Sequence, residues 1–162
     1  MLNNIRFEFA SHENEIDNET SDDYYTPPLV FEALGLQFDL DVCAPFGGVP
    51  WLPAHRSFNI IDDGLFQPWN GKVWMNPPFS GSGPWVSKFI EHGNGVALVP
   101  LSKSKWFNDL WQLSDGVLIL PPNLKFMNSI NESKSIFMPV CLAAIGDVNV
   151  QALRNSGLGH VR

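Results

Sequence analysis

Residues 83–101, GPWVSKFIEHGNGVALVPL, contain the change of pattern that decides the fold. The first part, residues 83–93, is expected to form a helix, because Pro84 stands near its start and a glycine follows its end. The second part, residues 95–101, is a short apolar run of the kind that forms a strand buried on both faces. A helix that leads directly into a buried strand is typical of α/β proteins with a parallel sheet.

The same alternation extends along the chain in both directions. Upstream, residues 26–34 (TPPLVFEAL) predict a helix with Thr26 as N-cap and prolines in the first turn, ended by Gly35. Strands are expected upstream at residues 36–44 (LQFDLDVCA), 57–61 (SFNII) and 72–75 (KVWM). Downstream, a helix is expected at residues 103–113 (KSKWFNDLWQL), and strands at residues 116–121 (GVLILP) and 135–146 (SIFMPVCLAAIG).

These elements predict an α/β domain with a mainly parallel sheet and helices on both faces. The last two strands have no helix between them, so we expect the last strand to be antiparallel. The length of 162 residues favours one domain, which we expect at residues 24–162, preceded by a mobile acidic segment at residues 1–23. Ligands of such sheets bind at the carboxyl ends of strands, where Asp41, residues 62–63, Asn76 and Pro100 are expected.

Composition and charge restrict the class of protein. Hydrophobic residues make up 44% and charged residues 17% of the chain, and no apolar run approaches the roughly 20 residues of a membrane helix. The N-terminus has no signal-peptide pattern, and Cys43 and Cys141 are expected to be reduced core thiols, so we predict a cytoplasmic protein. The histidines show no ligand spacing, and we predict no metal site; they are His12, His55, His92 and His160.

The net charge of −7 is concentrated at the N-terminus. Residues 1–23 hold seven of the 17 acidic residues and one of the ten basic residues, which leaves ten acids and nine bases in residues 24–162. The main part of the chain is therefore nearly neutral, and a local basic patch that binds nucleic acid is compatible with it.

A rigid corner follows the strand at residues 72–75, where residues 73–80 read VWMNPPFS. A turn would explain Asn-Pro and Pro-Pro, which are ordinary loop residues. The alternative is a pocket for a planar amine. The Asn76 side-chain oxygen and the Pro77 carbonyl would accept its two N–H groups, Pro78 would keep the corner rigid, and Phe79 would offer a face for stacking. Both acceptors would bind more strongly as positive charge develops on the nitrogen.

Residues 76–79 also match the [Asp/Asn/Ser]-Pro-Pro-aromatic motif of S-adenosylmethionine-dependent amino-methyltransferases. Together with YYTPPLVFEAL, FDLDVCAP, DDGLFQPWNGKVWMNPPFS and VALVPLSKSKWF, the chain resembles the phage-type Dam-like DNA N6-adenine methyltransferases over about residues 22–145. The resemblance implies a single-domain, Rossmann-like class I methyltransferase fold, S-adenosylmethionine as cofactor, and double-stranded DNA with a flipped adenine as substrate.

The resemblance also implies which residues hold the cofactor. Tyr25, Thr26 and Pro27 resemble the segment that binds the methionine end, although Thr26 is equally explained as an N-cap. Asp41, followed by Ala44, resembles the acid of the first cofactor motif, with Asp39 on the same strand face as the alternative. Asp63, just before Gly64, resembles the acid that accepts the adenine amine, unless it only caps a turn.

The sequence departs from the wider methyltransferase pattern in two places. No Gly-x-Gly follows Asp41, and Gly47 with Gly48 is expected to take its place. No acid occurs between Asp41 and Asp62, so Asp62 is expected to replace the acid that usually binds the ribose.

Four further residues are candidates for contact with DNA. Lys103 and Lys105 follow a predicted strand and would contact phosphate, or are simply solvated at a helix start. Lys125 and Phe126 lie where related enzymes pack an aromatic side chain near the flipped base, but for Phe126 we favour a place in the core.

Two other functions remain open. Glutamine-amide methyltransferases share the Asn-Pro-Pro-aromatic corner, but usually keep the glycine-rich cofactor loop that is missing here. A non-catalytic binding protein on a methyltransferase scaffold would have no chemical need for an intact corner. The sequence therefore favours a DNA methyltransferase that modifies the N6 amine of adenine.

Overall fold

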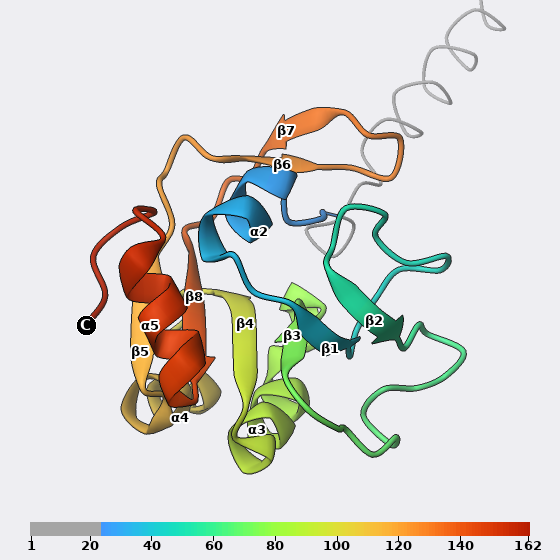
Figure 1. The fold of residues 1–162 in the computed structure, drawn as a ribbon, viewed down its shortest axis with the longest axis horizontal. Coiled ribbons are helices and arrows are strands. Elements are labelled where there is room, and N and C mark those ends of the chain that lie inside the picture. Colours follow the sequence, from blue (N-terminus) through green and yellow to red (C-terminus); the bar gives the residue numbers. More distant parts are fainter. Residues whose placement is uncertain (1–23) are drawn as a thin grey trace, which may run out of the picture.

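The computed structural model describes residues 24–162, so the acidic segment at residues 1–23 lies outside the described residues (Figure 1). Six strands form one sheet in the order β2-β1-β3-β4-β8-β5. Their bounds are β1 Phe38–Asp41, β2 Ala54–Ser57, β3 Val73–Met75, β4 Gly95–Pro100, β5 Gly116–Ile119 and β8 Val140–Ile145. β1 to β4 are parallel, and β8 lies antiparallel between β4 and β5. The predicted α/β class, mainly parallel sheet and antiparallel last strand are confirmed.

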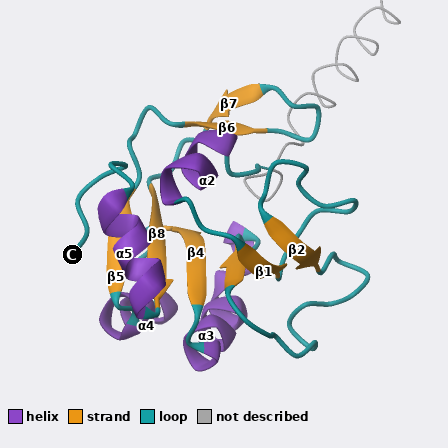
Figure 2. Ribbon diagram, in the orientation of Figure 1, coloured by secondary structure: helices purple, strands orange, loops and turns teal. Residues whose placement is uncertain are grey.

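Helices cover both faces of the sheet (Figure 2). α2 (Pro28–Leu34) and α5 (Asp147–Asn155) pack on one face, and α3 (Ser82–His92) and α4 (Lys105–Leu113) pack on the other. A separate hairpin of β6 (Lys125–Met127) and β7 (Ser133–Ser135) lies beyond the end of the sheet, near α2 (Figure 1). Neither this hairpin nor α5 was predicted from the sequence.

Successive side chains of a strand point to opposite faces of the sheet, so each strand can pack against helices on both faces. On β3, Trp74 points to the side of α2 and packs edge-on against Phe31, with ring centroids 4.7 Å apart. Its neighbours Val73 and Met75 point to the side of α3 and α4, where they share a core with Phe89. Because both faces are covered, the central strands must be apolar at successive positions, which accounts for the uninterrupted apolar run of β4.

The helix and strand predicted at residues 83–101 are confirmed. α3 ends at His92, and Gly93 adopts φ 74° while its N–H donates to the Phe89 carbonyl. This left-handed conformation suits glycine, which lacks the Cβ that would strain it. α4 begins at Lys105, two residues later than expected, and β8 begins at Val140, five residues later.

The strand predicted at residues 57–61 is wrong. β2 is Ala54–Ser57, so Ser57 alone of the predicted segment lies in a strand, and the strand begins earlier, where Ala54 pairs with Phe38 of β1. The following residues form a turn in which Ile61 N–H donates to the Asn59 side chain and Asn59 N–H donates to Asp62 Oδ2. Such local bonds to Asn and Asp side chains compete with strand pairing.

The prediction of Thr26 as N-cap is also wrong. α2 begins at Pro28, and its N-cap is Pro27, whose side chain has no oxygen to offer. The expected helix end is confirmed, because Gly35 adopts φ 61° and donates its N–H to the Phe31 carbonyl.

Two features are absent from residues 24–162. No helix in this part of the chain has both the length and the apolar character that crossing a membrane requires. The same residues contain no group of three or more His, Cys, Asp and Glu side chains arranged to hold a metal ion.

Candidate active site

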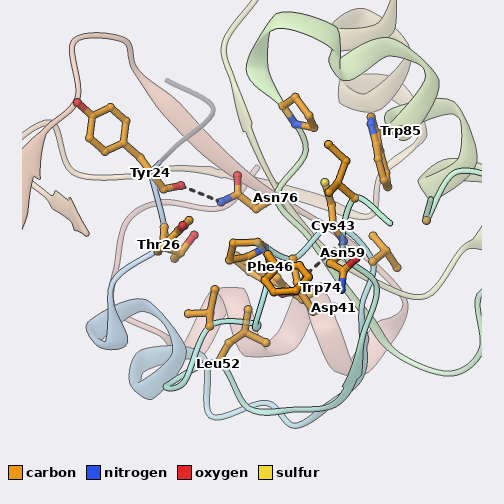
Figure 3. Close-up of a pocket in the computed structure, with 18 of the residues that line it drawn as sticks. Tyr24, Thr26, Asp41, Cys43, Phe46, Leu52, Asn59, Trp74, Asn76 and Trp85 are labelled. Carbon is orange, nitrogen blue, oxygen red and sulfur yellow. Dashed lines mark hydrogen bonds between the residues drawn. The ribbon is translucent and has the colours of Figure 1, made fainter. Parts of the chain in front are cut away.

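A cavity of about 480 Å³ opens at the carboxyl ends of β1 and β3 (Figure 3). Its walls come from segments that are distant in sequence: the residues before α2, the loop after β1, the turn at residues 59–64, the end of β3, and α3. The neighbouring positions of β1 and β3 in the parallel sheet bring these ends together. The cavity therefore lies where an open α/β sheet is expected to bind a ligand.

Eight of the predicted cofactor-binding and catalytic residues line this cavity: Tyr25, Thr26, Asp41, Ala44, Asp63, Gly64, Asn76 and Pro78. Four others of the two groups do not line it: Pro27, Asp62, Pro77 and Phe79. The four candidates for DNA contact also lie outside its walls: Lys103, Lys105, Lys125 and Phe126.

Asp41 is the buried acid of the cavity. Its side chain is 3% exposed, and its Oδ1 accepts the Cys43 N–H at 3.3 Å. Burial raises the pKa of Asp41 to about 7, against the smaller lowering effect of the Cys43 hydrogen bond. No basic side chain in residues 24–162 forms a salt bridge with this carboxyl group. The site therefore favours a cationic or hydrogen-bond-donating group of a ligand.

Asp39, the alternative acid on β1, has a structural role instead. Its Oδ2 accepts the Lys72 N–H at 2.7 Å. Gly71, at φ 73°, lies so close that an added Cβ would be 2.2 Å from the same oxygen. Asp39 is not part of the cavity wall.

Thr26 places an unpartnered hydroxyl in the cavity wall. The residue is 2% exposed, and its Oγ1 makes no hydrogen bond with residues 24–162. Its carbonyl accepts the Trp51 Nε1–H at 2.8 Å, which fixes the main chain at this point. A buried hydroxyl without a partner costs about 1–3 kcal/mol, so a polar ligand atom at this position would be stabilising.

The turn before β3 brings Asp63 and Gly64 to the opposite wall. Asp63 is exposed with φ 57°, and its carboxylate makes no hydrogen bond with the described residues. Gly64 lies against the end of β1, where an added Cβ would be 2.1 Å from the Val42 carbonyl oxygen. Only glycine permits this approach.

Asp62, expected to replace the acid that binds the ribose, does not line this cavity. Its Oδ2 accepts the Asn59 N–H at 2.9 Å, so Asp62 is the acid that closes the turn. The turn-capping role considered for Asp63 is therefore filled by Asp62.

The corner after β3 holds Asn76 at the cavity. Asn76 Nδ2 donates to the Tyr24 carbonyl at 3.3 Å, and Figure 3 shows the amide oxygen directed away from that carbonyl. The Pro78 carbonyl accepts the Gly81 N–H at 3.1 Å and the Ser82 hydroxyl at 3.2 Å, which ties the corner to the start of α3. Phe79 opens the short 3₁₀ helix η2 (Phe79–Gly81) and packs, half-buried, against the core.

Several cavity residues were not identified from the sequence. Trp85 of α3 stands beside Gly64 and stacks on Trp69 with ring centroids 6.4 Å apart. Phe46 and Ile60 line the cavity while remaining 77% and 87% exposed. The sequence offered one indication of such residues, namely large apolar side chains in Gly/Pro-rich loops. No motif, however, distinguishes a cavity residue of this kind from a core residue.

The candidate residues for DNA contact are distributed over other elements. Lys103 follows β4, and Lys105 at the start of α4 pairs on the surface with Asp109. Lys125 is exposed on β6. Phe126 is 1% exposed and belongs to the core shared with α2 and α5, which confirms the core interpretation.

Comparison with protein families places most of this chain in a known family. A family model described as DNA N-6-adenine-methyltransferase (Dam) matches residues 13–138. This range contains every residue of the cavity wall and the whole Asn-Pro-Pro-Phe corner. A comparison with curated proteins found no match.

Proposed function

Because this chain belongs to the DNA N-6-adenine-methyltransferase (Dam) family, we propose that it transfers a methyl group from S-adenosylmethionine to the N6 amine of adenine in DNA. The observation that carries this proposal is the position of Asn76, whose amide lies on the same cavity as the buried Asp41. The strand order, with one antiparallel strand between β4 and β5, supports a Rossmann-like class I methyltransferase fold. We expect the enzyme to act in the cytoplasm, where DNA is available.

The cavity residues fit S-adenosylmethionine, which supplies an electrophilic methyl group when bound. The unpartnered hydroxyl of Thr26, with Tyr25 beside it, would bind the methionine end. Asp41 would bind a cationic or N–H-bearing group, because no basic side chain in the described part of the chain forms a salt bridge with it. On the opposite wall, Asp63 would accept the adenine amine, with Gly64 leaving room for the ring.

At the corner, Asn76 Oδ1 and the Pro77 carbonyl would accept the two N–H bonds of the target amine. The amine lone pair is delocalised into the adenine ring, so the nitrogen is a poor nucleophile until this delocalisation is lost. As positive charge develops on nitrogen, both acceptors bind it more strongly, and the fixed corner needs little reorganisation. Phe79 would stack on the adenine after the base has left the duplex.

Product analysis tests this function. The protein is incubated with methyl-labelled S-adenosylmethionine and unmethylated duplex DNA, and the DNA is digested to nucleosides. We expect the label in N6-methyl-2′-deoxyadenosine. Label in glutamine of added protein would favour the amide methyltransferase, and no transfer, with cofactor bound, would favour a non-catalytic protein.

Substitution of Asn76 tests the mechanism. Asn76→Ala should reduce turnover by roughly 100-fold or more and leave the affinity for S-adenosylmethionine nearly unchanged, because the amide acts on the amine. Asn108→Ala, an exposed position on α4, is the matched control and should retain full activity. Turnover of Asn76→Ala equal to that of the wild type would contradict the mechanism.

A further inference from the structure

We propose that the main-chain carbonyl of Tyr24 is the positioning group of the corner, and that it makes this corner function with an amide but not with a carboxylate. The proposal rests on the proposed function of Asn76 and adds a restriction to it. The family motif accepts Asp, Asn or Ser at this position, so a carboxylate would ordinarily be expected to replace the amide.

The chemistry of the two groups fixes the orientation of the Asn76 amide. The Tyr24 carbonyl can only accept a hydrogen bond, and Nδ2 is the only donor of the Asn76 side chain. With Nδ2 3.3 Å from that carbonyl, Oδ1 is left for the cavity. The flipped amide would bring two acceptors together and turn the donor toward the target amine, which also donates.

The Tyr24 carbonyl is itself held in place. It shares a peptide unit with the Tyr25 N–H, which donates to the Met127 carbonyl of β6 at 2.7 Å. The Met127 N–H donates back to the Tyr25 carbonyl at 2.9 Å. In a trans peptide the C=O and N–H point in opposite directions, so a bond to Met127 on one side directs the carbonyl toward Asn76 on the other. β6 thus determines the orientation of Asn76 through one peptide plane.

A carboxylate in place of the amide would meet this carbonyl with an oxygen. Two acceptors at about the distance of a hydrogen bond repel each other, and the ionised form would be displaced from the corner. The protonated carboxyl group, in contrast, can donate its O–H to Tyr24 and present its other oxygen to the cavity. Activity of Asn76→Asp should therefore follow the protonated fraction.

Other groups of the cavity influence this titration. Among the described residues, the titratable side chains that line it are Asp41 at the end of β1, Cys43 just after it, Asp63 from the turn before β3, and Tyr24 and Tyr25 before α2. None of them is basic, so none would form an ion pair with a second carboxylate, and the two acids would oppose its ionisation. Asp41 also titrates in the wild type, so each activity is expressed as a ratio to the wild type at the same pH, and Asn76→Ala, which adds no charge, is the reference.

The first experiment is a pH profile of methyl transfer from pH 5.5 to 8.5, with saturating S-adenosylmethionine, for the wild type, Asn76→Asp and Asn76→Ala. At pH 8, Asn76→Asp should be no faster than Asn76→Ala. The rate of Asn76→Asp divided by the wild-type rate should rise by up to tenfold for each pH unit below pH 8, until the carboxyl group is fully protonated. The ratio for Asn76→Ala should stay constant. Wild-type activity of Asn76→Asp at pH 8, or a constant ratio, would overturn the proposal.

The second experiment does not require activity, so it separates this proposal from the proposed function. The melting temperatures of the wild type and Asn76→Asp are compared across pH. When a carboxyl group is harder to ionise in the folded than in the unfolded state, the protein loses stability as the pH rises. The melting temperature of Asn76→Asp should therefore fall increasingly below that of the wild type from about pH 4, the ordinary aspartate pKa. The difference should level off above the pKa of the carboxyl group in the folded state.

Asn108→Asp, exposed on α4 and three residues after Lys105, is the control and should show no growing deficit. A deficit of Asn76→Asp that is the same at all pH values would overturn the proposal. If the wild type does not methylate DNA, the proposed function fails, and the melting series still decides how Asn76 is oriented.

Discussion

At the scale of single residues, Asp41 is a cavity side chain whose surroundings disfavour its charge. It is 3% exposed, has one main-chain N–H as partner, and has a pKa raised to about 7 by burial. Each unit of raised pKa corresponds to about 1.4 kcal/mol by which folding disfavours the ionised form. Such a cost is retained at sites where a ligand supplies the missing partner.

Asp41→Asn should therefore stabilise the ligand-free protein at high pH. The unfolded carboxyl group ionises near pH 4, but the folded one stays protonated to about pH 7. The wild type loses stability between these values, and the asparagine variant does not. Urea unfolding at pH 5, 6, 7 and 8 should show an advantage of the variant that grows with pH. A constant difference would contradict the raised pKa.

The same variant should bind S-adenosylmethionine more weakly at pH 8, because the amide carries no negative charge. Titration calorimetry measures this affinity directly. Asp39→Asn is the control, since Asp39 lies on the same strand but outside the cavity. Unchanged affinity of Asp41→Asn would remove Asp41 from the proposed cofactor site.

At the scale of elements, α3 holds the turn that carries Asp63 and Gly64. Lys88 Nζ donates to the carbonyls of Gly64, Leu65 and Gln67 at 3.3, 2.7 and 2.5 Å. It also stands 5.0 Å from the centroid of the Trp69 ring, and the Trp69 Nε1–H donates to the Gly64 carbonyl at 2.8 Å. One helix thus satisfies main-chain carbonyls of a segment that has no strand partner, which fixes one wall of the cavity.

Lys88→Met should weaken S-adenosylmethionine binding by about tenfold. Hydrogen bonds from a charged donor are worth about 1.5–3 kcal/mol each, and water molecules would replace some of those that the lysine makes. Lys88→Arg should retain more affinity. Lys105→Met removes an exposed pair with Asp109 and serves as the control, with little expected effect. Affinities are measured by titration calorimetry and folding by circular dichroism. Wild-type affinity of a folded Lys88→Met protein would show that the turn holds without this lysine.

At the scale of the whole molecule, sheet order and charge distribution determine what the site can reach. The adjacency of β1 and β3 creates the cavity, and the antiparallel β8 lies between β4 and β5 in the same sheet. The net charge of −7 belongs mainly to residues 1–23, which lie outside the described residues. Phosphate contacts dominate nonspecific affinity for DNA, so these acids would compete with DNA for a basic surface.

Removal of residues 1–21 takes away five acids and Arg6 and changes the net charge from −7 to −3. We expect the shortened protein to fold, to keep its affinity for S-adenosylmethionine, and to bind duplex DNA more tightly at low salt. The advantage should shrink as salt rises, because mobile ions screen exposed charges. Fluorescence anisotropy with one duplex at two salt concentrations measures this. Equal affinities at low salt would leave the segment without a role in DNA binding.

The amino-acid sequence by itself determined the α/β class, the antiparallel last strand and the Asn-Pro-Pro-Phe corner at the end of a strand. These are local properties, because periodicity and turn residues depend on neighbours in the chain. Only the tertiary structure decided that Asp41 and Asp63 line the cavity while Asp39 and Asp62 do not. It also decided that the Tyr24 carbonyl, 52 positions away, contacts Asn76. Strand register and helix packing bring such groups together, and neither is encoded in the spacing of residues along one segment.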